Sequence, residues 1–536
     1  MAPLSAAAVH LTVATWLWAL LPLLALMLSM LVLRWGGKKA GPFGLAVALL
    51  VAWMRFGADI DVLENALLRG VLLSLPVLYI IIPALLLYHV ADAAGGIRNI
   101  GWSVSQMTKN HILQLMILAF GFTTFLQGVA GFGVPVAVVA PLLVGIGYPP
   151  VEAVAAALIG HAWSVSMGDM ASSFQALLSV TRLPPHELGV QVALLLGAAG
   201  LAAAVSIAHL HAGWGAVARW PAVVGVLGVV TTAAQVFLAW LDLWIVASFG
   251  AGMLCLLAGF AMARMARYQG PSRPASLPPK PEAQRVRSAL PPEGARRMSF
   301  HLAFAPYYSL IAVVSLATFV PAVHDALHAW RLRVALDETV TRLGVVTPGE
   351  VWRLAPLGHP GALLLYTALV GWLFYRLNGR WPGRQAALLR RTFQEAYPTS
   401  IGIVSMVALA SVMTASGMIG ILADGAAAAT GRVFPVISPL VGLLGCFVTG
   451  SNTNSNILFG AFQVEVGELI GVQPVLLAAA QSAGGSLGSM VAPAKVLVGC
   501  ATAGLAGREG EIFRRVAGYC AVQVLLIGTL AWWLAG

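Results

Sequence analysis

A run of seven small, polar and uncharged residues, Gly450-Ser-Asn-Thr-Asn-Ser-Asn456, lies between two apolar stretches. The apolar run Val433–Val448 precedes it, and another apolar stretch starts at Ile457. Hydrocarbon offers no water to polar backbone, so such a segment persists at membrane depth only where it lines a cavity or binds something. Its hydroxyls, amides and free helix-start N–H groups suit a small anion or ion at mid-membrane. The run holds no catalytic acid, base or nucleophile, so it favours a transporter.

Four residues of this run, Ser451, Asn452, Thr453 and Asn454, are candidate substrate-binding residues. Their hydroxyl and amide groups are suited to hydrogen bonds with a carboxylate. Ordinary helix capping is the alternative interpretation, because Ser, Asn and Thr are preferred N-caps. Capping requires one such residue, whereas six follow one another here, which favours binding.

Two ionisable residues lie in or near a break of a small-residue segment. Asp169 is flanked by Gly168 and Met170, and a charged residue within a span is a functional candidate by default. A structural ion pair or an N-cap is the alternative. His161 lies about two turns upstream, and the titration range of imidazole suits proton transfer, although a hydrogen-bonded core histidine is the commoner case. We treat Asp169 and His161 as candidate proton-coupling residues.

Four further residues complete the predicted site. Lys495 follows a second break, in which Ser486 lies, and would be a cationic partner for a carboxylate or for Asp169. Snorkelling of Lys495 to the membrane interface is the alternative. Gly131 and Gly133 would let the backbone approach a ligand closely, although a tight turn explains them equally well.

The composition places this chain among polytopic membrane proteins. It is 59% hydrophobic and 10% charged over 536 residues, whereas soluble domains carry about 25% charged residues. Recurring apolar runs predict about eleven to fourteen helical elements. The net charge of +11 does not indicate nucleic-acid binding, since the basic residues gather in loops between apolar runs. The four cysteines lie far apart in apolar segments, and we infer neither a disulfide nor a metal site.

The charge distribution predicts which loops face the cytoplasm. The loop with Arg34, Lys38 and Lys39 and the Pro- and Arg-rich segment 264–300 are basic, so the positive-inside rule places both in the cytoplasm. The acidic loop around Asp59 and the charge-balanced loop 323–358 would then face outward. We expect an N-terminal transmembrane half at 1–263, a cytoplasmic linker at 264–300 and a C-terminal transmembrane half at 301–536.

The two halves share an order of features. In each, a polar or Gly-rich tip precedes an apolar arm, a Gly-x-x-Pro turn and a helix interrupted by Gly, Ser and Met. The turns are Gly147-Tyr-Pro-Pro150 and Gly471-Val-Gln-Pro474. Paired Gly/Pro-interrupted segments in corresponding halves indicate a binding site between structural repeats. Close helix packing through small residues is the alternative.

The sequence resembles the L-lactate permease family, within the wider ion transporter superfamily. The matching residues are Gly131-Phe-Gly-Val-Pro-Val-Ala137, Thr449-Gly-Ser-Asn-Thr-Asn-Ser-Asn456, Gly484–Pro493 and Cys500-Ala-Thr-Ala-Gly-Leu505. The resemblance implies a scaffold plus a transport domain, with two re-entrant hairpins and broken helices, that works like an elevator. It also implies proton-coupled symport of L-lactate or a related 2-hydroxymonocarboxylate such as glycolate across a bacterial-type inner membrane. The Ser-Asn-Thr tips would then contact the substrate carboxylate.

A sodium-coupled carboxylate transporter of the same superfamily is the second reading. The tip Ser451-Asn452-Thr453 supports it, because such triplets also coordinate sodium in the dicarboxylate branch. The first tip, Gly131-Phe132-Gly133, lacks the triplet and opposes it. We expect a small carboxylate and the bilayer as partners, no nucleic acid, no cofactor beyond an ion gradient and no enzymatic activity, since metal, nucleophile-elbow and nucleotide motifs are missing from the sequence. A homodimer is left open.

Overall fold

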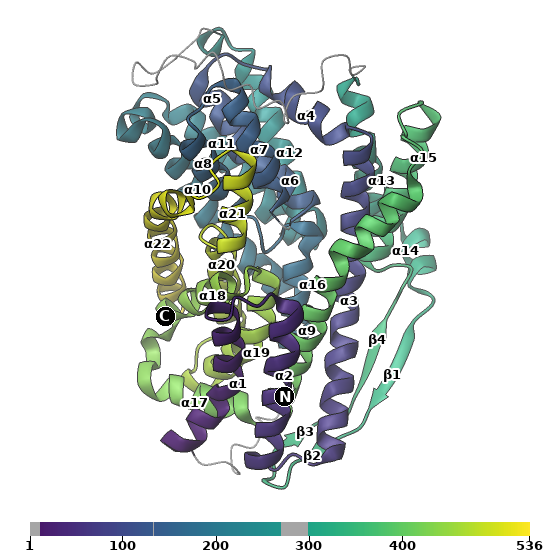
Figure 1. The fold of residues 1–536 in the computed structure, drawn as a ribbon, viewed down its shortest axis with the longest axis vertical. Coiled ribbons are helices and arrows are strands. Elements are labelled where there is room, and N and C mark those ends of the chain that lie inside the picture. The colour runs from purple at the N-terminus through teal and green to yellow at the C-terminus, as the bar shows by residue number, and fades with distance from the viewer. Residues whose placement is uncertain (1–10, 132, 270–297) are drawn as a thin grey trace.

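The computed structural model describes residues 11–131, 133–269 and 298–536 (Figure 1). In this part of the chain, 12 helical segments are long and apolar enough to cross a membrane. The protein is thus an all-α polytopic membrane protein, as the apolar runs predict. Most of the predicted linker, residues 270–297, lies outside the described residues.

One group of helices packs around a helix of 34 residues, α3 (Ile60–Ala93). Asp59 caps α3, since its side chain accepts a hydrogen bond from the backbone N–H of Val62. The group buries apolar side chains such as Leu26, Val77 and Met406 in a core that also takes in residues of α9 (Ser172–Thr181), α17 (Met418–Thr430) and α19 (Asn452–Ile470). Its other helices are α1 (Val13–Leu31), α2 (Gly37–Arg55), α4 (Gly96–Ser105), α13 (Phe300–Phe319), α14 (Pro321–His328), α15 (Pro360–Leu377) and α16 (Gln385–Ala415).

Two small antiparallel sheets lie beside α3, in the loop expected to face outward (Figure 1). Strand β1 (Leu332–Leu336) pairs with β4 (Glu350–Leu354), and β2 (Thr339–Val340) pairs with β3 (Val346–Thr347). The amide of Asn65 donates to the Asp337 carbonyl at 3.1 Å, so this loop contacts the N-terminal part of α3. The loop around Asp59 and the loop 323–358, which the charge pattern assigns to the outside, therefore lie at the same end of the protein. The strands are absent from the sequence-based prediction.

The second group of helices contains both predicted repeats. The first repeat runs through α5 (His111–Leu115), the π-helical η1 (Met116–Phe122), α6 (Thr123–Val129), α7 (Val134–Ile146), α8 (Pro150–Ala162), η2 (Asp169–Ala171) and α9 (Ser172–Thr181). The second runs through α18 (Phe434–Thr449), α19 (Asn452–Ile470), α20 (Pro474–Gly488) and α21 (Pro493–Thr502). They pack with α10 (Pro185–Arg219), α11 (Pro221–Trp240), α12 (Trp244–Ala263), α17 (Met418–Thr430) and α22 (Glu509–Leu534); η3 (Ala266–Tyr268) and η4 (Gly431–Val433) are short turns.

The predicted order of tip, arm, turn and broken helix is present in both repeats. Gly147 and Gly471 end the arms α7 and α19 with left-handed φ values of 107° and 70°. Glycine adopts this conformation without a steric cost, which lets each chain reverse. Pro150 and Pro474 then occupy the first positions of α8 and α20, where a missing N–H costs nothing.

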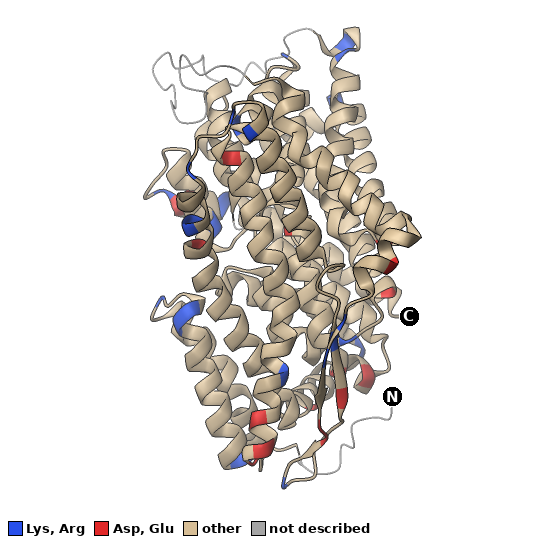
Figure 2. Cartoon of the chain, turned by 90° about the vertical axis from the view of Figure 1, so that its right-hand side faces the viewer, with Lys and Arg blue, Asp and Glu red and all other residues tan. Residues whose placement is uncertain are grey.

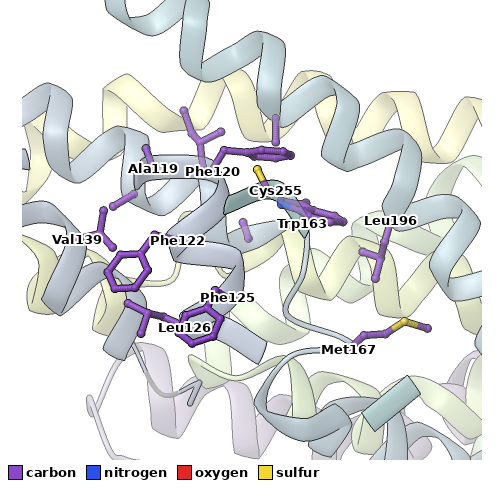
Figure 3. Close-up of a cluster of buried hydrophobic side chains, with 14 of the residues drawn as sticks. Ala119, Phe120, Phe122, Phe125, Leu126, Val139, Trp163, Met167, Leu196 and Cys255 are labelled. Atoms are coloured by element: carbon purple, nitrogen blue, oxygen red, sulfur yellow. The ribbon is translucent and has the colours of Figure 1, made fainter. Parts of the chain in front are cut away.

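An aromatic core supports the first repeat from behind (Figure 3). The rings of Phe120 and Trp163 stack with their centroids 5.6 Å apart, so η1 contacts the end of α8. Gly160 makes this approach close, because a Cβ there would lie 1.6 Å from the carbonyl oxygen of Ala119. Charged residues gather towards the ends and at one level midway, and the helix faces between them carry few (Figure 2). Having few charges on these faces is what helices that contact lipid require.

Candidate functional site

The second tip forms where α18 gives way to α19. Gly450 turns the chain with φ at 72°, and Ser451 caps α19 by accepting a hydrogen bond from the N–H of Asn454 at 3.4 Å. Capping therefore explains part of the role of Ser451, as the alternative interpretation expects. It does not explain the side chains that follow, which contact the other repeat.

Side chains of the second tip bind the break of the first repeat. Asn452 Nδ2 donates to Ser166 Oγ at 2.9 Å, and the Thr453 and Ser173 hydroxyls are 2.8 Å apart. Asn456 Nδ2 donates to the Ser173 carbonyl at 2.8 Å. These bonds join segments about 280 residues apart in sequence. The two repeats therefore build one polar region, which requires both to be folded together.

The break of the first repeat has unusual backbone geometry. Asp169, Met170 and Ala171 have φ values of 50°, 51° and 61°, in the left-handed region. Left-handed helical backbone costs an L-residue about 1–2 kcal/mol, and such strain gathers at functional sites. The Asp169 carboxylate accepts hydrogen bonds from the Gly131 N–H at 3.3 Å and the Ser172 hydroxyl at 3.0 Å. The first tip and the first break are thereby held together.

The second break places Lys495 in the first turn of α21, which starts at Pro493. Lys495 is 8% exposed, and its ammonium makes no ion pair or hydrogen bond within the described parts of the chain. Asp169 borders the same cavity and attracts this ammonium, but the two do not form a direct ion pair. A buried ammonium without a direct partner is costly. Its position is therefore suited to an anion brought from outside the protein.

A cavity of about 260 Å³ joins the tips and the breaks. This volume is slightly below the usual range of small-molecule sites, about 300–1,000 Å³, and suits a small ligand. Seven of the predicted site residues line it: Gly131, Asp169, Ser451, Asn452, Thr453, Asn454 and Lys495. Spacing and residue type alone pointed to these seven, and the fold brings them together.

Three predicted residues lie outside the cavity lining. Gly133 begins α7 with φ at 87° and serves the turn. The Ser486 hydroxyl donates to the Ala162 carbonyl and accepts from the N–H groups of Val165 and Ser166, so it ties the two breaks together. His161 is fully buried; its Nδ1 donates to the Leu158 carbonyl at 2.9 Å. The roles of these three in binding or coupling stay predictions.

Sequence reasoning missed several residues that line the cavity. Gln127, Ser172 and Ser173 belong to the first repeat, and Gln127 lies only four positions before Gly131. The opposite wall comes from the group around α3: Gly36, Gly37, Lys38, Pro398, Thr399 and Gly402. Lys38 is exposed, with its ammonium 4.7 Å from the centre of the Tyr397 ring. The Pro398-Thr399 pair inside the long apolar helix α16 was a signal that could have been used.

The cavity therefore lies between the two groups of helices. It borders the basic loop between α1 and α2, which the positive-inside rule assigns to the cytoplasm. Among the described residues, no cluster of three or more His, Cys, Asp or Glu could hold a metal ion. The polar groups offered to a ligand are hydroxyls, amides, one buried carboxylate and one buried ammonium.

Comparison with known proteins gives a match over nearly the whole chain. Residues 15–535 match the family model described as L-lactate permease. The L-lactate permease of Escherichia coli (strain K12) is 30% identical over 534 residues, covering 96% of this chain and 94% of the relative. Glycolate permease GlcA of the same organism is 28% identical with the same coverage. Among solved structures, the YdaH transporter of Alcanivorax borkumensis has a TM-score of 0.48 and 14% identity, covering 88% of both chains.

Proposed function

Since the chain belongs to the L-lactate permease family and is thus a membrane transporter of the bacterial plasma membrane, we propose that it carries L-lactate or a related 2-hydroxymonocarboxylate, such as glycolate, in symport with a proton. The observation that carries this proposal is the buried position of Lys495 beside the cavity. Its ammonium is buried, borders a small cavity and makes no direct ion pair within the described residues. A monocarboxylate would pair with it directly.

The second tip completes the site for the carboxylate. The hydroxyls of Ser451 and Thr453 border the cavity, as does the start of α19. The first N–H groups of a helix have no intrahelical acceptor, and the helix dipole favours an anion there. The carboxylate would thus be bound by two elements of the second repeat, the start of α19 and Lys495 of α21.

Amide groups of the tip suit the hydroxyl of a 2-hydroxy acid. The Oδ1 atoms of Asn452 and Asn454 are buried and have no hydrogen-bond partner among the described residues. An unpaired buried acceptor costs about 1–3 kcal/mol. The single hydroxyl hydrogen of a 2-hydroxy acid would remove this cost at one acceptor of the site, whereas a second carboxylate group would repel such acceptors.

Counting charges supports coupling to one proton. The buried lining residues of the empty site, Asp169 and Lys495, contribute −1 and +1. A bound monocarboxylate adds −1, and a proton on Asp169 returns the sum to zero. Moving net charge through a low-dielectric region is expensive. The loaded and the empty site are equally neutral only when each anion travels with one proton.

The walls of the cavity come from two groups of helices, which supports alternating access. Gly37 and Gly402 belong to α2 and α16 of the group around α3, whereas the tips and breaks belong to the group of the two repeats. Movement of the second group against the first would carry the substrate from one side to the other. The positive-inside rule predicts that the basic α1–α2 loop faces the cytoplasm, which supports a cavity that opens to the cytoplasmic side.

The test is uptake of labelled L-lactate by the purified protein in sodium-free proteoliposomes under an inward proton gradient. We expect accumulation above equilibrium that a protonophore abolishes, and competition by glycolate but not by succinate. Uptake that requires sodium would contradict proton symport. Folded protein that takes up none of these acids would mean that the site serves another substrate.

A further inference from the structure

Gln127 lies at the end of α6, at the edge of the same cavity, and no other glutamine among the described residues borders it. We propose that Gln127 is a specificity-determining residue whose side-chain amide oxygen accepts a hydrogen bond from the 2-hydroxyl of the carried acid. This inference rests on the proposed function. It adds a contact from the first repeat to the tip residues of the second.

The side chain of Gln127 is buried, and its amide oxygen is unpaired within the described part of the chain. It is 1% exposed, and its Oε1 has no hydrogen-bond partner among the described residues. Gln463, Gln481 and Gln523 are also buried with unpaired amide oxygens, but none of them borders this cavity. Among the described glutamines, Gln127 alone combines an unpaired amide oxygen with a place in the cavity lining.

Two glycines leave room for the amide of Gln127. A Cβ at Gly168 would lie 2.7 Å from both Cγ and Nε2 of Gln127, and a Cβ at Gly131 would lie 3.4 Å from Nε2. Both glycines are close to Asp169: the Gly131 N–H donates a hydrogen bond to its carboxylate, and Gly168 precedes it in the sequence. A side chain at position 168 would displace the amide, so Gly168 is required for the position that Gln127 takes beside the cavity.

The chemistry of an amide oxygen decides what it can recognise. It accepts hydrogen bonds and repels carboxylate oxygens. It therefore distinguishes acids by the substituent on C2, the carbon next to the carboxylate. A 2-hydroxy acid offers an O–H there, whereas propionate offers only C–H. A site that hydrogen-bonds a substrate hydroxyl rejects the analogue without it, because the buried acceptor is then left unpaired.

The experiment compares the affinities of L-lactate and propionate for the purified full chain, measured by calorimetry, in wild type and Gln127→Met. Met has a similar length and lacks the acceptor. We expect the lactate-to-propionate affinity ratio to fall by about 5- to 150-fold, mainly through weaker lactate binding. Propionate binding in the same preparation reports that the variant is folded. Should Gln127→Met not fold, Gln127→Asn withdraws the amide by one methylene and is expected to lower the ratio as well.

The matched control is Gln114→Met, which removes a buried glutamine from the same span without touching the cavity; its ratio is expected to equal that of wild type. A wild-type ratio in Gln127→Met, or equal losses for both acids, would overturn the inference and leave the carrier proposal standing. A wild-type protein that binds neither acid would instead contradict the proposed function.

Discussion

Asn452 Nδ2 lies 2.9 Å from Ser166 Oγ, and this hydrogen bond joins the tip of the second repeat to the break of the first. Ser166 in turn donates to the Ser482 carbonyl at 2.9 Å, in the broken helix of the second repeat. One hydroxyl thereby connects a tip and both broken helices. The geometry of the cavity depends on this connection, because its walls come from the same segments.

Replacing Asn452 with Ala removes the bond that joins this residue of the cavity lining to Ser166. We expect lactate uptake to be lost while the protein is still inserted and folded, because one neutral hydrogen bond contributes only about 0.5–1.5 kcal/mol to stability. Uptake and surface abundance are measured together. Asn378→Ala, at an exposed position near the end of α15, is the control. Normal uptake by Asn452→Ala would exclude the tip from the site.

Replacing Lys495 with Met removes the proposed counter-charge of the substrate. Hydrogen bonds to charged groups contribute about 1.5–3 kcal/mol, so we expect the KM for lactate to rise about 10- to 100-fold. Lys39→Met is the control, since Lys39 is an exposed lysine of α2 outside the cavity lining. An unchanged KM for Lys495→Met would favour the alternative, that Lys495 snorkels to the membrane interface and does not bind the substrate.

Replacing Asp169 with Asn keeps an acceptor for the Gly131 N–H but removes the site for a proton. We expect the variant to exchange labelled for unlabelled lactate and to lose proton-driven accumulation. Asp242→Asn is the control. Asp242 also has a left-handed φ, at 60°, but it is exposed and lies outside both tips. Accumulation by Asp169→Asn under a proton gradient would contradict the assignment.

Replacing Gly160 with Ala tests the packing behind the first break. The new Cβ would meet the backbone of η1, and overpacking of this kind costs about 1–3 kcal/mol or more. We expect a lower Tm in detergent. Gly145→Ala adds a Cβ with nothing within 4 Å and is expected to be neutral or stabilising. Equal Tm values for the two variants would show that η1 and α8 do not pack this closely.

Replacing Glu350 with Gln tests an ionic link on the side predicted to face outward. Glu350 pairs with Arg69 of α3 at 2.8 Å and with Arg182, after α9, at 2.6 Å. Arg69 is 4% exposed and would lose its counter-charge, so we expect a loss of about 1–3 kcal/mol. Thermal unfolding measures it, with the exposed Glu338→Gln as the reference. A Tm equal to that of Glu338→Gln would mean that Arg69 is stabilised by its carbonyl contacts alone.

The sequence predicted the tips, turns and breaks because they violate hydrophobic periodicity with small polar residues, glycine and proline. Lys495 and Asp169 were recognisable for the same reason, as charges within apolar segments. The cavity wall from α2 and α16 was not, because Gly37 and Gly402 differ little from any packing glycine until the helices are placed. Gln127 lies inside a normal apolar span, and only the fold shows that its amide oxygen is unpaired. Strands β1 to β4 are short and lie in a loop whose charges masked their alternation.

The central claim is that each monocarboxylate crosses with one proton, so that no net charge moves. It is tested most directly in sodium-free proteoliposomes in which the proton gradient and the membrane potential are set independently, the latter with valinomycin and potassium. The account predicts that lactate accumulation follows the proton gradient and is unchanged when a potential of either sign is imposed. Accumulation driven by the potential alone, or only after sodium is added, would contradict it.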